Sequence, residues 1–270
     1  MKTVLKIIDY YINSSIHVSI ATSALGLITY FFANEPVNYN VIAFIFSATF
    51  TSYNFIKYWP YVISHYQLKN TLKSIIFLVI LALFYSIYLF FTFNIKAQLI
   101  IFFVSFLNVL YAIPITPHSN NFRNYGHIKI YIVSLCWAIL TLLFPLYELN
   151  AEINIDVIIK LFQRFILTLS LILLFEINDL KLDPQHLKTV PQTLGINKTK
   201  YIVYLLGVVF YILDFLKIKN YQSQITINLI LLAVLYTFTY FSNADKPRYY
   251  TLFGVESIPI IWYLLIIILE

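Results

Sequence analysis

Residues 165–184 read FILTLSLILLFEINDLKLDP, a long apolar run that ends in three carboxylates. Glu176, Asp179 and Asp183 are spaced i, i+3, i+7, so a helix through this stretch projects all three from one face. Like charges at a membrane boundary are costly unless a cation neutralises them. Hard carboxylate oxygens suit Mg²⁺, which takes one or two protein carboxylates, waters and substrate phosphate. We therefore predict a metal site at these three residues; the alternative is a solvated helix end paired by neighbouring lysines.

The rest of the chain is equally apolar. It has 270 residues, of which 60% are hydrophobic and 11% charged, with a mean hydropathy of +0.80. These values lie outside the range of soluble globular domains. Stretches of about 17 to 25 apolar residues are long enough to cross a bilayer as helices, which satisfy their own backbone groups. We predict an all-α integral membrane protein with nine spans, at about 14–32, 39–58, 73–93, 96–114, 128–147, 155–177, 200–218, 223–242 and 250–269.

Basic residues predict the orientation of these spans. With the N-terminus in the cytoplasm, thirteen Lys and Arg residues face that side, including Lys57, Arg123 and Lys188, against Lys96, Lys217 and Lys219 on the other. This asymmetry follows the positive-inside rule and predicts a multi-pass protein of the cell (inner) membrane. The net charge of +6 is explained by lysines that face anionic lipid, so we expect the lipid bilayer as a partner and no nucleic acid.

Aromatic residues are abundant, with 24 Phe and 23 Tyr. Most rings are expected to face lipid or form interfacial belts. Some are candidates to line a pocket for an isoprenoid, because ring faces stabilise positive charge. Tyr53, Tyr58 and Tyr61, at the end of the second predicted span, are the best placed.

Two further segments complete a family pattern. The motif Glu176-x-x-Asp179-x-x-x-Asp183 is followed by LKTVPQTLG at 187–195, and YAIP at 111–114 precedes a basic loop, with Trp137 in the next span. Over nearly the whole chain this pattern resembles the UbiA-type intramembrane prenyltransferases. The resemblance implies a single domain over 1–270 with a central cavity. It also implies Mg²⁺-dependent transfer of a prenyl group from an isoprenoid diphosphate donor to an aromatic or other lipophilic acceptor.

The family's first acidic motif is missing, however. Where the family has N-D-x-x-D-x-x-x-D, residues 54–62 read NFIKYWPYV, so the asparagine remains and all three aspartates are absent. A leaving diphosphate needs cations to stabilise its charge. We therefore predict Asp179 and Asp183 as catalytic metal ligands, together with Glu176. Substrate-binding residues are predicted at Asn54, Lys57, Tyr58, Tyr111, Arg123 and Lys188, with Lys57 supplying charge or else only anchoring the helix at the interface.

Two other functions remain open. Loss of the first motif favours a non-catalytic relative that binds an isoprenoid or quinone-like lipid, or scaffolds a membrane partner. A secondary transporter is less favoured, because no paired Gly/Pro-broken helices are evident. Polar residues inside the spans are further candidates. Glu256 is expected to face the cytoplasmic cavity, His17 to touch an acceptor or a neighbouring helix, and Lys160 and Arg164 to snorkel or pair with Asp156.

Overall fold

The computed structural model describes residues 2–63, 70–112, 126–218 and 222–269, and every regular element in these ranges is helical. In chain order the elements are α1 (Lys2–Asn13), α2 (Ile16–Ala33), α3 (Tyr39–Ile63), α4 (Asn70–Phe90), α5 (Ile95–Ala112), α6 (Gly126–Ala138), η2 (Ile139–Leu143), α7 (Phe144–Glu148), α8 (Ile155–Asp179), η3 (Gln185–Leu187), α9 (Val190–Leu194), α10 (Ile196–Ile212), η4 (Leu213–Leu216), α11 (Gln222–Phe241), η5 (Tyr250–Gly254), η6 (Val255–Ser257) and α12 (Ile258–Leu269).

Within the described ranges, eight helical segments are long and apolar enough to cross a membrane. They are α2, α4, α5, α6 to α7, α8, α10 to η4, α11 and η5 to α12. The one predicted span without a counterpart among these eight is 39–58; it corresponds to α3, which has 25 residues but is not apolar enough to qualify. The physical reason is its polar content from Thr49 onward, which includes Thr49, Ser52, Asn54 and Lys57. The count of nine spans is therefore not confirmed.

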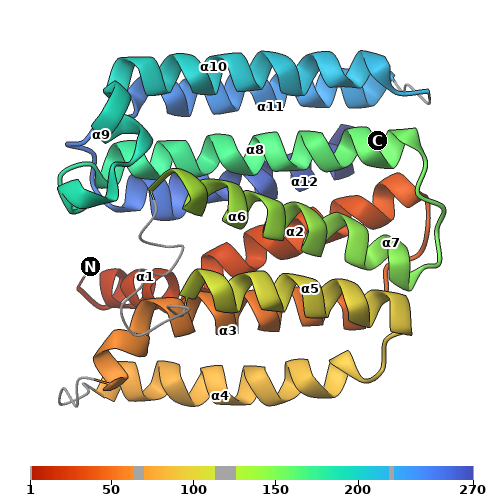
Figure 1. The fold of residues 1–270 in the computed structure, drawn as a ribbon, viewed down its shortest axis with the longest axis horizontal. Helices are drawn as coiled ribbons and strands as arrows, with labels where there is room; N and C mark the ends of the chain where they lie inside the picture. Colours follow the sequence, from red (N-terminus) through yellow and green to blue (C-terminus); the bar gives the residue numbers. More distant parts are fainter. Residues whose placement is uncertain (1, 64–69, 113–125, 219–221, 270) are drawn as a thin grey trace.

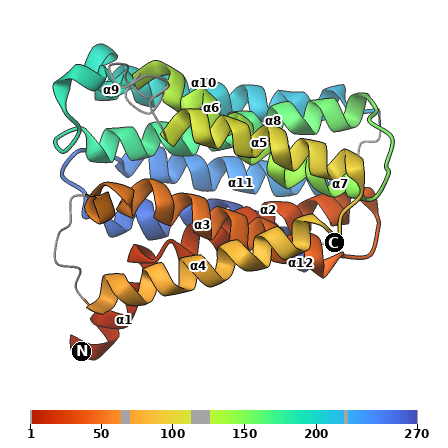
Figure 2. The same ribbon diagram turned by 60° about the horizontal axis from the view of Figure 1, so that its bottom comes forward.

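The long helices lie alongside one another in one bundle, with α4 at one edge and α10 at the other (Figures 1 and 2). The two termini lie at opposite ends of the bundle. The N-terminus shares its end with α1 and α9, and the C-terminus lies at the end that holds α7. The acidic end of α8 therefore points toward the end where the chain begins.

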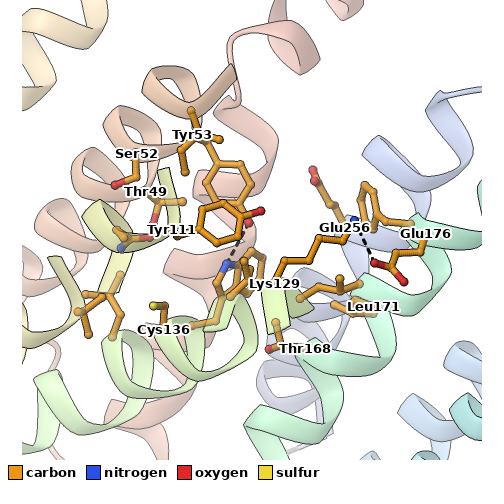
Figure 3. A pocket seen from close by; sticks show the side chains of 18 of the residues that line it. Thr49, Ser52, Tyr53, Tyr111, Lys129, Cys136, Thr168, Leu171, Glu176 and Glu256 are labelled. Atoms are coloured by element: carbon orange, nitrogen blue, oxygen red, sulfur yellow. Dashed lines mark hydrogen bonds and ion pairs between the residues drawn. The ribbon is translucent and has the colours of Figure 1, made fainter. Parts of the chain in front are cut away.

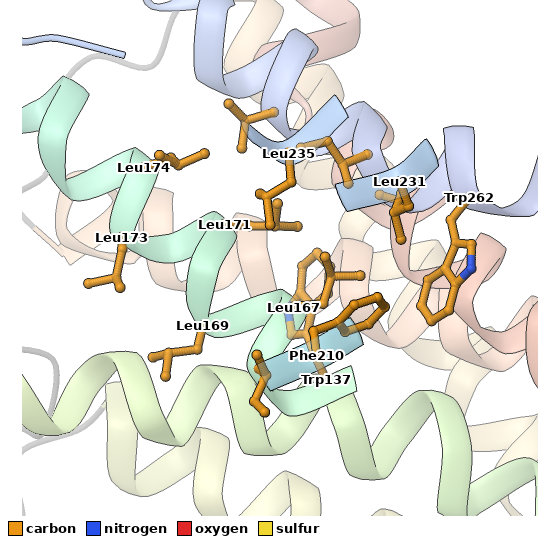
Figure 4. Close-up of a cluster of buried hydrophobic side chains, with 14 of the residues drawn as sticks. Trp137, Leu167, Leu169, Leu171, Leu173, Leu174, Phe210, Leu231, Leu235 and Trp262 are labelled. Carbon is orange, nitrogen blue, oxygen red and sulfur yellow. The ribbon is translucent and has the colours of Figure 1, made fainter. Parts of the chain in front are cut away.

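Burial separates central helices from peripheral ones. Of the spanning window of α2, 61% is buried inside the protein, against 17% for α4 and for α5. Exposed Phe77, Phe84 and Tyr88 make α4 a lipid-facing surface. The main core instead gathers leucines of α8 against α10, α11 and α12 (Figure 4), including Leu167, Leu171, Leu174, Phe210, Leu231, Leu235 and Trp262.

A π-helical turn, η2, interrupts the span between α6 and α7. Such turns release backbone carbonyls from regular helix bonding. The Thr141 carbonyl accepts hydrogen bonds from Thr29 Oγ1 and from Arg164 Nη1, both at 2.6 Å. Arg164 is only 1% exposed, so it does not snorkel as expected from the sequence. Lys160 likewise forms no ion pair with an acid among the described residues; its Nζ lies 3.6 Å from the centroid of the Phe32 ring.

Candidate functional site

A cavity of about 650 Å³ lies among α3, α5, α6, α8 and the segment that starts α12 (Figure 3). Its wall is apolar and aromatic along most of its length, and carboxylates gather where α8 ends. The residues that line it include Phe44, Tyr53, Tyr111, Lys129, Cys136, Trp137, Phe175, Glu176, Asp179, Asp183 and Glu256. Trp137 Nε1 donates to the Tyr53 hydroxyl at 3.0 Å and so holds both rings in place.

Lys129 of α6 reaches across the cavity to the acidic end of α8 (Figure 3). Its Nζ lies 3.0 Å from Glu176 Oε1 and 3.8 Å from Asp183 Oδ2. The side chain of Glu176 is only 3% exposed, and its Oε2 accepts a hydrogen bond from the Val190 amide at 3.1 Å. This is a partly buried ion pair, in which removing one partner leaves an uncompensated charge.

Asp183 does not lie on α8. The helix ends at Asp179, and the amides of Leu182 and Asp183 both donate to the Asp179 carbonyl at 2.8 Å. The reason is Pro184, which disfavours a helical conformation of the residue before it. The spacing argument for three carboxylates on one helix face is therefore wrong for Asp183. A turn returns it to the same cavity instead.

The segment after the turn fixes this arrangement. Gln192 Nε2 donates to the carbonyls of Asp183 and Pro184, at 3.0 and 3.2 Å. Gln192 Oε1 accepts from the Thr189 amide at 3.0 Å, at the start of α9. The segment 187–195 thus holds the turn after α8 in place by hydrogen bonds. Lys188, within this segment, is exposed and does not line the cavity.

In the described part of the chain, no three His, Cys, Asp or Glu side chains converge closely enough to hold a metal ion by themselves. The chemistry of the cavity nonetheless suits a divalent cation. Four carboxylates line it, and among the described Lys and Arg side chains only Lys129 joins them. Since Mg²⁺ commonly uses one or two protein carboxylates and completes its shell with substrate phosphate, Asp179 and Asp183 fit an ion that arrives with a diphosphate.

Three predicted substrate-binding residues of α3 do not line the cavity. Asn54 Nδ2 donates to the carbonyls of Ser14 and Phe50, at 2.7 and 2.8 Å. Lys57 Nζ and the Tyr58 hydroxyl both donate to the Asn13 carbonyl, at 2.8 and 2.7 Å. These groups donate hydrogen bonds to carbonyls at the end of α1. Regular helix bonding stops there before α2 begins, and these carbonyls would otherwise be unpaired.

Of the remaining predicted residues, Tyr111 lines the cavity. Arg123 and the side chain of Tyr61 lie outside the described residues. Lys129 was missed, because a lysine near the start of an apolar span reads from the sequence only as a positive-inside residue. Its contact with Glu176 joins positions 47 residues apart, which no local spacing reveals.

No family model matches the sequence, and no curated protein matches it either. Solved structures do match the fold, and it is that of the UbiA-type prenyltransferases, as the sequence motifs predicted. One similar structure is that of digeranylgeranylglyceryl phosphate synthase, with a TM-score of 0.60, 17% identity and 98% of each chain covered. Another is a UbiA homologue from Archaeoglobus fulgidus bound to GPP and Mg²⁺, with a TM-score of 0.54, 14% identity, and 96% of this chain and 94% of that one covered.

Proposed function

We propose that the whole chain, 1–270, is one prenyltransferase domain that moves a prenyl group from an isoprenoid diphosphate to a lipophilic acceptor inside the membrane. The observation that carries this proposal is a single cavity with a carboxylate-rich end, one lysine and an aromatic wall. The fold supports it, since one protein of the same fold is bound to GPP and Mg²⁺.

In this proposal the donor lies with its diphosphate at the acidic end. Asp179 and Asp183, with Glu176, would hold the Mg²⁺, whose charge would neutralise that of the diphosphate and so make it a better leaving group. Lys129, already placed between Glu176 and Asp183, presents its ammonium group to the phosphate oxygens. The C1–O bond of the donor breaks, and the diphosphate leaves with the electron pair.

The aromatic wall then acts on the carbon half of the donor, after the diphosphate has left. Departure of the diphosphate leaves an allylic cation, and ring faces such as those of Tyr111 and Tyr53 stabilise a cation by their quadrupole. The apolar wall also excludes water, which would otherwise quench the cation. The acceptor enters from the lipid side, forms the new bond to C1 with its own electron pair, and releases a proton.

Binding of geranyl, farnesyl and geranylgeranyl diphosphate to purified protein in nanodiscs tests this proposal. We expect binding that requires Mg²⁺ and is lost in EDTA, followed by diphosphate release when an acceptor is supplied. Protein that binds none of the three donors in Mg²⁺ would contradict it.

A non-catalytic lipid-binding relative is the second candidate. It is favoured by the absence of carboxylates on α3, where Asn54 and Lys57 bond to backbone carbonyls. Such a protein would bind an isoprenoid or quinone-like lipid in the same cavity without dependence on Mg²⁺. The EDTA comparison therefore separates the two functions.

We further propose that the acidic end faces the cytoplasm of a cell (inner) membrane protein. A cysteine at exposed Gln185, beside this end, is expected to resist an impermeant thiol reagent in intact cells and to react after permeabilisation. A cysteine at exposed Glu152, at the opposite end, is the matched control and should react in intact cells. The native Cys136 is buried, so its background is low. Labelling at Gln185 in intact cells would overturn the topology.

A further inference from the structure

One carboxylate of the cavity comes from a different part of the chain than the other three. Glu256 lies in η6, just before α12, and lines the same cavity as Lys129 and Glu176 (Figure 3). Its side chain is half-buried. Within the described part of the chain, its carboxylate makes no hydrogen bond and no ion pair, whereas Glu176 and Asp183 share Lys129. An uncommitted carboxylate in an apolar cavity is costly unless a ligand satisfies it.

The backbone around Glu256 is irregular and held in place. The π-helical turn η5 and the 3₁₀ turn η6 precede α12, and such departures from α geometry are common at functional sites. His17 Nε2 lies 3.1 Å from both the Phe253 carbonyl and Ser257 Oγ, which flank Glu256 in sequence. His17 Nδ1 in turn bonds to the Tyr11 hydroxyl at 2.8 Å. The position of Glu256 is therefore braced from α1 and α2.

The cation that acts on Glu256 does not bond to its carboxylate, so this carboxylate can accept a hydrogen bond from a ligand. Lys57 is the cation that acts on it most directly, but the Lys57 ammonium is bonded to the Asn13 carbonyl. Burial, and secondarily the negative charge of Glu256, raise the pKa of Tyr11. Glu256 therefore lines the cavity wall with no Lys or Arg of the described residues bonded to its carboxylate.

We propose that Glu256 accepts a hydrogen bond from the hydroxyl group of the prenyl acceptor, and that it selects a neutral hydroxyl-bearing acceptor, such as a phenol, over a carboxylate. This rests on the proposed prenyl transfer. An anionic acceptor would meet four carboxylates in one cavity, whereas a phenol supplies the donor that Glu256 lacks. In the transfer step the acceptor oxygen bonds to C1, the diphosphate leaves with the C1–O electron pair, and the phenolic proton passes to Glu256.

The experiment compares 4-hexylphenol with 4-hexylbenzoate, which share one apolar body, by titration calorimetry in nanodiscs with empty nanodiscs subtracted. Wild-type protein should prefer the phenol by about tenfold or more, the scale of a hydrogen bond to a charged group. Glu256→Gln should shrink this preference to about threefold or less, and Glu256→Asp should retain most of it. Binding of geranyl diphosphate with Mg²⁺ should change by less than about twofold in both variants.

Two outcomes overturn the inference. One is an unchanged preference in folded Glu256→Gln protein; the other, which needs no variant, is wild-type protein that binds the benzoate as tightly as the phenol. Failure of the proposed transfer looks different. In that case no variant binds geranyl diphosphate, while the preference for the phenol still reports on Glu256.

Discussion

The end of α8 and the second half of α3 carry polar side chains at the same end of one bundle, yet they use them differently. On α8 and the turn after it, Glu176, Asp179 and Asp183 open into the cavity. On α3, the amide of Asn54 and the ammonium of Lys57 point away from it and bond to carbonyls of the α1–α2 junction. The end of α8 thus supplies polar groups to the cavity, whereas Asn54 and Lys57 of α3 supply hydrogen bonds to the junction between α1 and α2.

The break explains the difference. Between α1 and α2 the backbone of Ser15 takes a left-handed conformation, with φ of 60°, and regular helix bonding stops. A buried carbonyl left without a partner costs about 1–3 kcal/mol, so donors from another helix are favoured there. Carboxylates have no proton to give at neutral pH and cannot fill this role. An amide, an ammonium and a hydroxyl can, and these are the groups that α3 presents.

The largest expected effect comes from Lys129 of α6, whose ion pair with Glu176 belongs to the α8 end and not to α3. Lys129→Met leaves Glu176 buried without its cation, and the free energy of unfolding should fall by about 3–5 kcal/mol. The double variant Lys129→Met/Glu176→Gln should recover most of that loss. Chemical denaturation in detergent measures both. Equal stability of the single variant and the wild type would mean that the ion pair is not formed in the membrane.

Asp179 and Asp183 test whether the α8 end is a site at all. Asp179→Asn and Asp183→Asn should each weaken Mg²⁺-dependent binding of geranyl diphosphate by roughly a hundredfold, because one ligand of a charged complex is lost. Asp245→Asn is the control, since Asp245 is 77% exposed and pairs with Lys181 at the surface. Unchanged donor binding in both site variants would favour a solvated helix end.

Asn54 tests the structural role of α3. Asn54→Ala removes two hydrogen bonds to buried carbonyls, so the protein should lose about 1–3 kcal/mol of stability while donor affinity is preserved. Thermal unfolding and donor titration on the same sample separate these readouts. A variant with unchanged stability but weakened donor binding would instead show that Asn54 binds the donor.

Lys57 should show the smallest effect. Its bond to the Asn13 carbonyl predicts a stability loss of about 0.5–1.5 kcal/mol in Lys57→Ala, with donor affinity unchanged. If Lys57 instead supplies counter-charge to the diphosphate, as the altered motif suggested, donor affinity should fall by about 1.5–3 kcal/mol. The Mg²⁺ dependence of binding, measured in parallel, should persist in either case.

The sequence by itself determined that this is a helical membrane protein. Long apolar runs leave the backbone no partner but itself, so helices follow from composition alone. The motif Glu176-x-x-Asp179 and the segment at 187–195 also pointed to the fold family, because they are local patterns within one stretch of chain. Composition likewise explains why α3 does not qualify as an apolar span.

Only the tertiary structure decided which polar groups meet. Lys129 pairs with Glu176, Lys57 bonds to the Asn13 carbonyl, and Glu256 lines the cavity. These partners lie far apart in the sequence, so no local residue spacing predicts the contacts. The physical reason is that the rotation of each helix about its axis is set by packing against its neighbours. A polar residue in a span therefore reveals that it needs a partner, but only the packed bundle decides whether that partner is a backbone carbonyl, a lysine or a ligand.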